Sequence, residues 1–183
     1  MRRLLRNVCV VSAFFLCAGA AGAQTSQAPE PALLETVGPD GHFSIKMPGT
    51  PEFSSSQLTL AAKLSPKGNN VRINYFTISL DNDNVAYILA YEDFPADVDL
   101  SRPDDILAAA RDGSAQGEKL VSDAPLSLGG VPGRAYTIAK ANATLIVVHA
   151  FLAGQRLYQL IVVTSKGYTA QNLDAFMNSF VIR

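Results

Sequence analysis

The sequence predicts an α+β protein: a single-domain α/β/α sandwich with a central antiparallel sheet and two main helices. Residues 56–64 alternate between apolar and polar side chains, which indicates a strand with one wet face, as in antiparallel sheets. Two later stretches, Thr144–Leu152 and Leu157–Val163, are almost entirely apolar, so both faces of these strands are expected to be covered. Two segments have the pattern of a helix. One helix on each face of the sheet is therefore the expected layering.

The first residues have the pattern of an export signal. Arginines precede a short apolar run, Val8–Leu16, and the small residues Ala21-Gly22-Ala23 are typical of a signal-peptidase site. A membrane-spanning helix needs about 20 apolar residues, and this run ends sooner. We expect a signal peptide over residues 1–23, a mature chain that begins at Gln24, and a periplasmic or secreted protein without an integral membrane segment. An uncleaved membrane anchor is the alternative.

The composition of the mature chain excludes several classes of function. Removing residues 1–23 from the 183 leaves 160, with 12 basic and 16 acidic side chains and a formal net charge of −4. Both cysteines, Cys9 and Cys17, lie in the removed segment, so disulfides, thiol catalysis and cysteine-ligated metal centres are not expected. A net-acidic chain also lacks the dense basic face that nucleic acids require. We expect no cofactor and no nucleic-acid partner.

Turn residues divide the mature chain into its first elements. Residues 24–32 are polar and contain two prolines, so we expect a disordered spacer there, followed by one domain over residues 33–183. Pro39-Asp40-Gly41 indicates a hairpin between two short extended runs. The strands expected in this half of the chain are Leu33–Val37, His42–Met47, Ser56–Leu64, Val71–Leu80 and Val85–Glu92.

Both helices have recognisable boundaries, and four more strands are expected between them. Ser101 is the expected N-cap of the first helix, and Gly113 and Gly117 are expected to end or fray it. The second helix, about three turns long, is expected near the C-terminus, where an apolar stripe would dock it on the sheet. The stripe consists of Leu173, Phe176, Met177 and Phe180.

His149 is the first residue to consider for catalysis. It lies in an apolar strand, and the turn at Ala153-Gly154 would place it opposite Leu157 or Tyr158. The side chain could serve as a base or a ligand, but no nucleophile or acid stands at a recognisable spacing. A packed, hydrogen-bonded histidine is the simpler interpretation. No catalytic, cofactor-binding or metal-binding residue is assigned from the sequence.

Two polar turns have alternative interpretations. His42 stands at the shoulder of the first hairpin, where an exposed turn residue is expected. Asp81-Asn82-Asp83-Asn84 together with Glu92 has the spacing of a calcium loop, but Ala86 stands where such loops require glycine. A solvated hairpin turn is therefore favoured over a calcium site.

Charge is distributed unevenly along the chain. Asp81–Asp112 holds nine acidic residues against two arginines, whereas Gly113–Arg183 holds six basic residues against three acidic ones. An acidic segment could steer a partner or a cation, and a solvated loop followed by a helix start would give the same pattern. The solvated segment is the simpler interpretation.

Four short stretches together resemble PsbP-like bacterial domains. They lie near the start of the domain, at a mid-chain turn, in the penultimate strand and in the closing helix: Phe43–Pro51, Gly130–Arg134, Arg156–Leu160 and Phe176–Phe180. The resemblance implies an α/β/α sandwich with a central antiparallel sheet. Members of that fold family serve largely as accessory or binding proteins, for instance extrinsic photosystem subunits and a Ran-binding import factor. The family brings no catalytic motif to transfer.

The sequence therefore favours an exported, non-catalytic accessory or binding domain with a protein or small-molecule partner. This interpretation is based on a well-patterned core, an export signal and the absence of a recognisable catalytic motif. A small periplasmic hydrolase that uses His149 is one alternative. An envelope-associated structural protein whose acidic segment meets a basic partner is the other.

Overall fold

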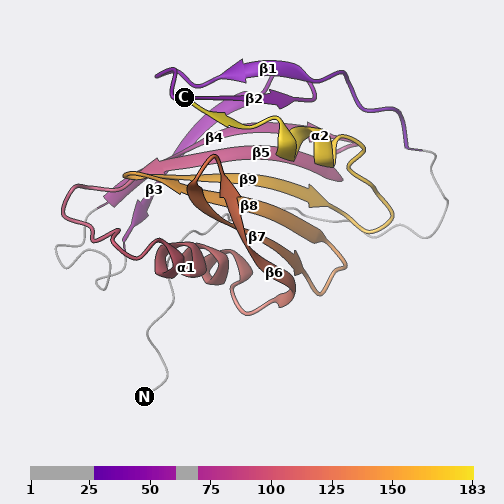
Figure 1. Ribbon diagram of the computed structural model, residues 1–183. Coiled ribbons are helices and arrows are strands. Elements are labelled where there is room, and N and C mark those ends of the chain that lie inside the picture. Colours follow the sequence, from indigo (N-terminus) through magenta and orange to yellow (C-terminus); the bar gives the residue numbers. More distant parts are fainter. Residues whose placement is uncertain (1–26, 61–69) are drawn as a thin grey trace.

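Figure 1 presents the computed structural model, which describes residues 27–60 and 70–183. The strands are β1 (Leu34–Val37), β2 (Phe43–Met47), β3 (Glu52–Thr59), β4 (Asn70–Leu80), β5 (Val85–Asp93), β6 (Lys119–Leu128), β7 (Val131–Ala139), β8 (Leu145–Ala153), β9 (Arg156–Thr164) and β10 (Val181–Ile182). The helices are α1 (Pro103–Ala115) and α2 (Leu173–Asn178). No helix within the described ranges is long and apolar enough to cross a membrane.

A seven-stranded antiparallel sheet forms the centre, in the order β3-β4-β5-β9-β8-β7-β6. β5 and β9 occupy its middle, and eight successive residues of β5, from Val85 to Glu92, are buried. In β9 the residues from Leu157 to Val162 are buried too, which confirms that the strand expected at Leu157–Val163 is covered on both faces. β8 lies nearer the edge and is less buried than we expected: Leu145 at its start is 44% exposed.

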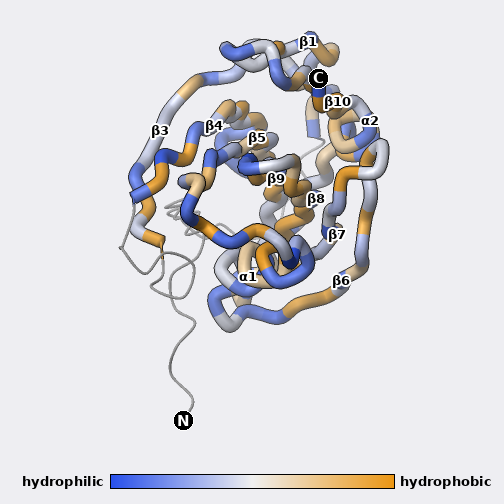
Figure 2. Tube along the Cα trace, turned by 60° about the vertical axis from the view of Figure 1, so that its left-hand side comes forward, coloured by the Kyte–Doolittle hydropathy of each residue, from blue (hydrophilic) through white to orange (hydrophobic). Residues whose placement is uncertain are grey.

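Two layers cover the seven-stranded sheet, one on each face (Figure 2). α1 covers one face, which we call the α1 face, with Ile106, Leu107 and Ala110 buried against the sheet. The opposite face, the α2 face, is covered by α2 together with a three-stranded sheet in the order β1-β2-β10. The α+β fold with layers on both faces of an antiparallel sheet is thus confirmed. The small sheet is an addition to the predicted helical layer.

The core of the α2 face is rich in aromatic side chains. Phe43 of β2 lies 5.9 Å from Phe76, 5.7 Å from Tyr158 and 6.2 Å from Phe180, measured between ring centroids. Phe176 of α2 is fully buried and packs edge-on against Tyr87. Such offset and edge-to-face pairs are the favoured aromatic geometries. The apolar stripe near the C-terminus therefore does dock on the sheet, as predicted.

Several boundaries differ from the predicted ones. α2 has six residues rather than about three turns, because the chain leaves the helix at Ser179 to form β10. α1 begins after Arg102, with Pro103 in its first turn, and has no side-chain cap, so the prediction of Ser101 as N-cap is wrong. The helix continues through Gly113 and ends where Gln116 adopts φ of 47°.

The N-terminal part of the sheet also departs from the predicted pattern. The strand expected at 56–64 is β3, which starts earlier, and residues 61–64 lie outside the described residues. β3 is an edge strand and is exposed along most of its length. Within the predicted range, however, Leu60 is buried in the core of the α1 face and Leu58 packs against it, while Gln57 and Thr59 are exposed. The described part of the alternation therefore does have the wet and dry faces that we expected.

Residues 27–32 form no helix or strand, yet they are held in place. Gln27 exchanges two hydrogen bonds with the backbone of Thr169, at 2.6 and 2.9 Å. The Glu30 carboxylate accepts hydrogen bonds from the Tyr87 hydroxyl at 2.6 Å and from the backbone N–H groups of Gln171 and Asn172. This part of the expected disordered spacer instead runs along the loop that leads into α2.

Candidate functional site

Arg156 forms the centre of a polar cluster at one end of the sheet. It starts β9, directly opposite Asp93 at the end of β5. Its Nε and Nη2 donate to the two carboxylate oxygens of Asp93 at 2.6 and 2.7 Å, a bidentate pair. Its Nη1 donates to Asp40 in the β1–β2 turn. We call Arg156, Asp93 and Asp40 the Arg156 cluster; it ties the small sheet to the large one.

Aromatic rings and carboxylates fix the Arg156 guanidinium in place. The guanidinium carbon lies 4.6 Å from the centre of the Tyr91 ring and 5.7 Å from that of Tyr158. The hydrogen bond to Asp93, assisted by the one to Asp40, raises the pKa of Arg156, although burial opposes the shift. Burial alone would raise the pKa of Asp40, but the hydrogen bonds from Arg156 and from the His42 backbone, together with the positive charge of Arg156, outweigh burial and lower the pKa. The Arg156 guanidinium and the Asp40 carboxylate are therefore both charged at neutral pH.

A cavity of about 410 Å³ adjoins this cluster. Five of its lining residues belong to the large sheet and its β8–β9 turn, and three belong to the small sheet and the segments flanking it. The lining consists of Asp93, Ala153, Gln155, Arg156, Tyr158, His42, Ile182 and Arg183. A volume of this size lies within the range of about 300–1,000 Å³ of small-molecule sites.

The small sheet supplies a second set of polar groups to the cavity. Arg183 follows β10, and its backbone N–H donates to the carbonyl of His42 at 2.8 Å. Its Nη2 donates to Glu35 and Ser44, each at 3.1 Å. His42 is held by Asp40, which accepts from its backbone N–H at 3.1 Å and lies 3.4 Å from its Nδ1. Arg183 and His42 are about half and two-thirds exposed, so both can meet a ligand.

The cavity is equipped for polar recognition rather than for nucleophilic chemistry. Its eight lining residues include no Ser, Thr, Cys or Lys. Tyr158 is the remaining hydroxyl, and burial raises its pKa, so it stays protonated at neutral pH. The lining offers guanidinium, imidazole and amide donors beside one carboxylate.

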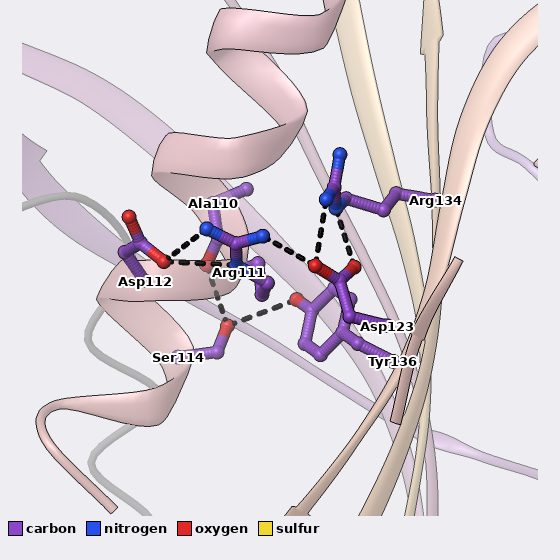
Figure 3. Close-up of polar contacts among 7 residues, drawn as sticks. All are labelled: Ala110, Arg111, Asp112, Ser114, Asp123, Arg134 and Tyr136. Carbon is purple, nitrogen blue, oxygen red and sulfur yellow. Dashed lines mark hydrogen bonds and ion pairs between the residues drawn. The ribbon is translucent and has the colours of Figure 1, made fainter. Parts of the chain in front are cut away.

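A second cluster of charged groups lies beneath α1 (Figure 3). Asp123 of β6 accepts hydrogen bonds from Nε and Nη2 of Arg134 on β7 at 2.5 and 2.6 Å, and one from Arg111 on α1. We call these three residues the Asp123 cluster. The hydrogen bond from Arg134, with that from Arg111, lowers the pKa of Asp123 against the effect of burial. Beside it the Ser114 hydroxyl donates to the Ala110 carbonyl and lies 3.1 Å from the Tyr136 hydroxyl.

The Asp123 cluster is a structural tie rather than a binding site. Its three side chains are each about four-fifths buried, and none of them lines the cavity. Every carboxylate oxygen of Asp123 already has an arginine partner. The cluster therefore joins α1 to the edge of the sheet.

His149 has no catalytic arrangement around it within the described residues. It lies between Ala135 and Leu160, not opposite Leu157 or Tyr158, because the β8–β9 hairpin closes on a two-residue turn. Its ring is partly buried and packs edge-on against Phe151. Burial lowers its pKa, which favours the neutral form. No hydrogen bond or ion pair joins its side chain to another described residue, so the predicted packing is present but the predicted hydrogen bond is not.

The other polar segments singled out in the sequence do not converge on one site. Asp81, Asn82 and Asp83 form a hairpin turn with φ between 52° and 64°, and Asn84 bonds back to Asp81. No group of three or more metal-ligating side chains occurs among the described residues. The acidic residues of 81–112 lie at opposite ends of β5, in the loop after it and on α1.

Sequence reasoning missed the Arg156 cluster. Asp40 and Arg156 are 116 positions apart, and Asp93 is 63 positions from Arg156. The sequence did identify Asp40 as a turn residue and Arg156-Leu157-Tyr158 as the start of a strand. The sequence alone did not reveal the strand register that places Arg156 opposite Asp93.

No family model matches the chain, and the comparison with curated proteins gives no match either. Among solved structures, the chain is similar to the cyanobacterial PsbP protein (CyanoP) from Synechocystis sp. PCC 6803, with a TM-score of 0.51. The superposition covers 91% of this chain and 98% of the other. The chain has a PsbP-like fold. The two chains share 13% sequence identity, so the similarity shows the fold alone. It confirms, for the fold, the resemblance to PsbP-like domains that the sequence indicated.

Proposed function

We propose that this protein is an exported, non-enzymatic accessory module that binds a small polar ligand in the cavity beside Arg156. The observation that carries the proposal is the cavity itself. It lies between two sheets that the Arg156 cluster locks together, so its walls are fixed before a ligand arrives. A preformed site avoids the entropic cost of ordering side chains on binding.

The PsbP-like fold supports a binding role over a catalytic one. That fold, as the sequence resemblance implies, is used largely by accessory proteins, and it brings no catalytic motif. The alternative of a hydrolase that uses His149 gains no support, because among the described residues neither a carboxylate nor a nucleophile contacts this side chain. The cavity lining also lacks a serine, threonine, cysteine or lysine nucleophile.

Export is the second part of the proposal. Its support is the pattern of residues 1–23, which ends in Ala21-Gly22-Ala23. The mature chain would begin at Gln24 and consist of a short N-terminal segment followed by one domain over residues 33–183. N-terminal sequencing of protein recovered from the periplasm or medium should return Gln24. A lipid-modified Cys17 or an intact Met1 would contradict this route.

A ligand screen tests the binding role. The mature protein would be melted in the presence of a broad set of small polar metabolites, alongside an Ala153→Leu variant that fills the cavity and an Ala141→Leu control. Ala153 lines the cavity, whereas Ala141 is exposed in the turn between β7 and β8. We expect a ligand to raise the melting temperature of the wild type and the control but not of Ala153→Leu.

The same metabolites would be assayed for turnover, together with ester, glycoside and phosphate substrates. Turnover that disappears in His149→Gln while the fold survives would replace the proposal with the hydrolase alternative. Failure of every metabolite to stabilise the wild type would also count against a ligand-binding role.

A further inference from the structure

We propose that two copies of this chain associate through the open edge of β3, so that their seven-stranded sheets join into one. The proposal does not depend on the cavity or on its ligand. It comes from a comparison of the two strands that end the sheet, β3 and β6, which lie on opposite sides of the curved sheet (Figure 2). An edge strand exposes unpaired backbone N–H and C=O groups, and proteins usually protect such a strand against pairing with another chain.

β6 is protected in several ways. Its register against β7 shifts between Leu120 and Ser122, which marks a bulge that disturbs regular pairing. Pro125 lies within the strand and has no N–H to donate. Lys119 places a charge at the start of the strand and Asp123 another near its middle, and charged side chains oppose the approach of a further strand. Another β-strand would therefore meet several obstacles at this edge.

β3 has none of these features. It pairs with β4 residue for residue from Glu52 to Thr59, without a shift in register. The strand contains no proline or lysine, and its single charged side chain, that of Glu52, stands at its first position. With eight residues it is longer than the typical strand of about 5–6. β3 is therefore a long and regular edge to which another strand can add.

The side chains of β3 leave room for an arriving strand and offer it an apolar contact. Ser54, Ser55 and Ser56, in the middle of the strand, are short and exposed. Phe53 is 57% exposed, and its ring centroid lies 5.2 Å from that of Phe76 on the α2 face. A neighbouring strand would cover part of the Phe53 ring. Pairing would thus remove apolar surface from water in addition to satisfying backbone groups.

A second copy of the chain is the partner that this pair of edges favours. Joining β3 of one copy to β6 of the next would continue without end into a filament, and the features of β6 oppose it. Joining β3 to β3 about a two-fold axis uses the open edge of both copies and leaves β6 at both ends of the joined sheet. It also brings no like charges together, because Glu52 lies at the end of the strand, away from the axis.

The symmetry restricts the register of the joined strands. Antiparallel pairing about an axis perpendicular to the sheet keeps the α1 faces of both copies on the same side. Residues that stand opposite each other then belong to the same face, so the axis passes through a residue. In the middle of β3 that residue is Ser55 or Ser56. The residue on the axis is the one that lies directly opposite its own counterpart.

Single cysteines test this contact, because both cysteines of the sequence lie in residues 1–23 and the mature chain has none. Ser55→Cys and Ser56→Cys would be exposed to mild oxidation, with Ser127→Cys at an exposed position of β6 as the matched control. The Cα atoms of directly opposite residues lie about 4.5–5.5 Å apart, within the range that a disulfide spans. We expect one of the two β3 variants to form a covalent dimer at least about tenfold faster than the other variant and the control.

Sedimentation of the unmodified mature chain measures the association itself. Between about 10 μM and about 1 mM we expect the mass to rise from that of one chain toward that of two, and no further. Ser55→Lys would place two positive charges opposite or diagonal to each other, so it should weaken dimerisation at least about tenfold. Ser127→Lys makes the same change on β6 and should leave dimerisation unchanged. Circular dichroism of both variants checks that the fold is retained.

Each of several results would overturn the proposal. A mass of one chain at every concentration would mean that the β3 edge does not pair with itself, and an extended peptide of another protein would become the better partner. A mass above that of two chains would mean an open chain of copies instead of a closed pair. A dimer that Ser55→Lys does not weaken would have its interface elsewhere. Equal cross-linking of the three cysteine variants would mean random collision rather than a defined contact.

Discussion

The two faces of the seven-stranded sheet each carry one cluster of arginines and carboxylates, and the clusters have opposite composition. On the α1 face, one carboxylate, Asp123, is held between Arg111 and Arg134. On the α2 face, one guanidinium, Arg156, is held between Asp93 and Asp40. Both clusters tie an outer layer to the sheet. They differ in what surrounds them.

That difference separates a structural tie from a candidate binding site. All three side chains of the Asp123 cluster are mostly buried, and the Asp123 side chain is 18% exposed. In the Arg156 cluster the guanidinium is covered, but Asp93 is largely open to solvent and faces a cavity. Similar ion pairs can therefore be closed off beneath a helix in one place and lie beside an open cavity in another. Four predictions test this comparison.

The largest effect should come from the aromatic core of the α2 face rather than from either cluster. Phe176 is fully buried in α2, a helix too short to be stable alone. We expect Phe176→Ala to lower the free energy of unfolding by about 3–5 kcal/mol, because it removes a buried aromatic and leaves a cavity. Urea denaturation measures the change. Asn178→Ala, at an exposed position of the same helix, is the control and should change stability little.

A wild-type midpoint in Phe176→Ala would mean that α2 is not held by its apolar stripe. The Glu30 contacts at the start of the helix would then be the main anchor of this layer. The Arg156 cluster would then also contribute more to the stability of the α2 face than the aromatic core does.

The second-largest change in stability should distinguish the two charged clusters. Asp123→Ala leaves Arg111 and Arg134 without their shared, mostly buried carboxylate, and we expect a loss of about 2–4 kcal/mol. Asp93→Ala should cost about 1 kcal/mol or less, because Asp93 is exposed and Asp40 still holds Arg156. Thermal and urea unfolding of the two variants compare them. Equal losses would show that exposure does not distinguish the clusters.

The central strands were predictable because their pattern is local. β4, β5 and β9 lie within one or two residues of the ranges expected from turn residues and apolar runs. The small sheet was only half predictable. The turn at Asp40 indicated the β1–β2 hairpin. In contrast, β10 has only two residues, and it pairs with β2 although the two strands lie at opposite ends of the domain sequence. No local pattern could indicate that pairing.

The candidate site was less predictable than the fold for the same reason. Arg156, Asp93 and His42 lie in separate parts of the sequence, and each alone resembles an ordinary surface residue. They meet because strand register and the hairpin turn bring them to one end of the sheet. Conversely, His149 stood out in the sequence, but its strand position gives it apolar neighbours.

The third prediction concerns how tightly β7 approaches β8 beside the aromatic core. A Cβ atom on Gly133 would lie 2.6 Å from the Phe151 ring and 2.7 Å from the Ala150 carbonyl oxygen. The backbone contact cannot move aside easily, so Gly133→Ala should cost about 1–3 kcal/mol. Gly130→Ala is not an adequate control, because its φ of 87° introduces strain of its own. An exposed Ser127→Ala on β6 serves instead. Unchanged stability in Gly133→Ala would mean that β7 and β8 have room to separate at this point.

The smallest effect is the dependence of stability on acid. The pKa values of Asp40 and Asp123 are both lowered in the folded protein, so their contributions are present above the unfolded pKa, near 4, and disappear as pH falls through the lower folded values. Unfolding free energies would be compared between about pH 5 and about pH 2 for wild type, Asp40→Asn and Asp123→Asn. The loss of stability below about pH 4 should be shallower in both variants. Asp40 is 31% exposed against 18% for Asp123 and has one arginine partner instead of two, so Asp40→Asn should change the slope less. The reverse order would mean that the Arg156 cluster, not the Asp123 cluster, is the more strongly stabilising of the two.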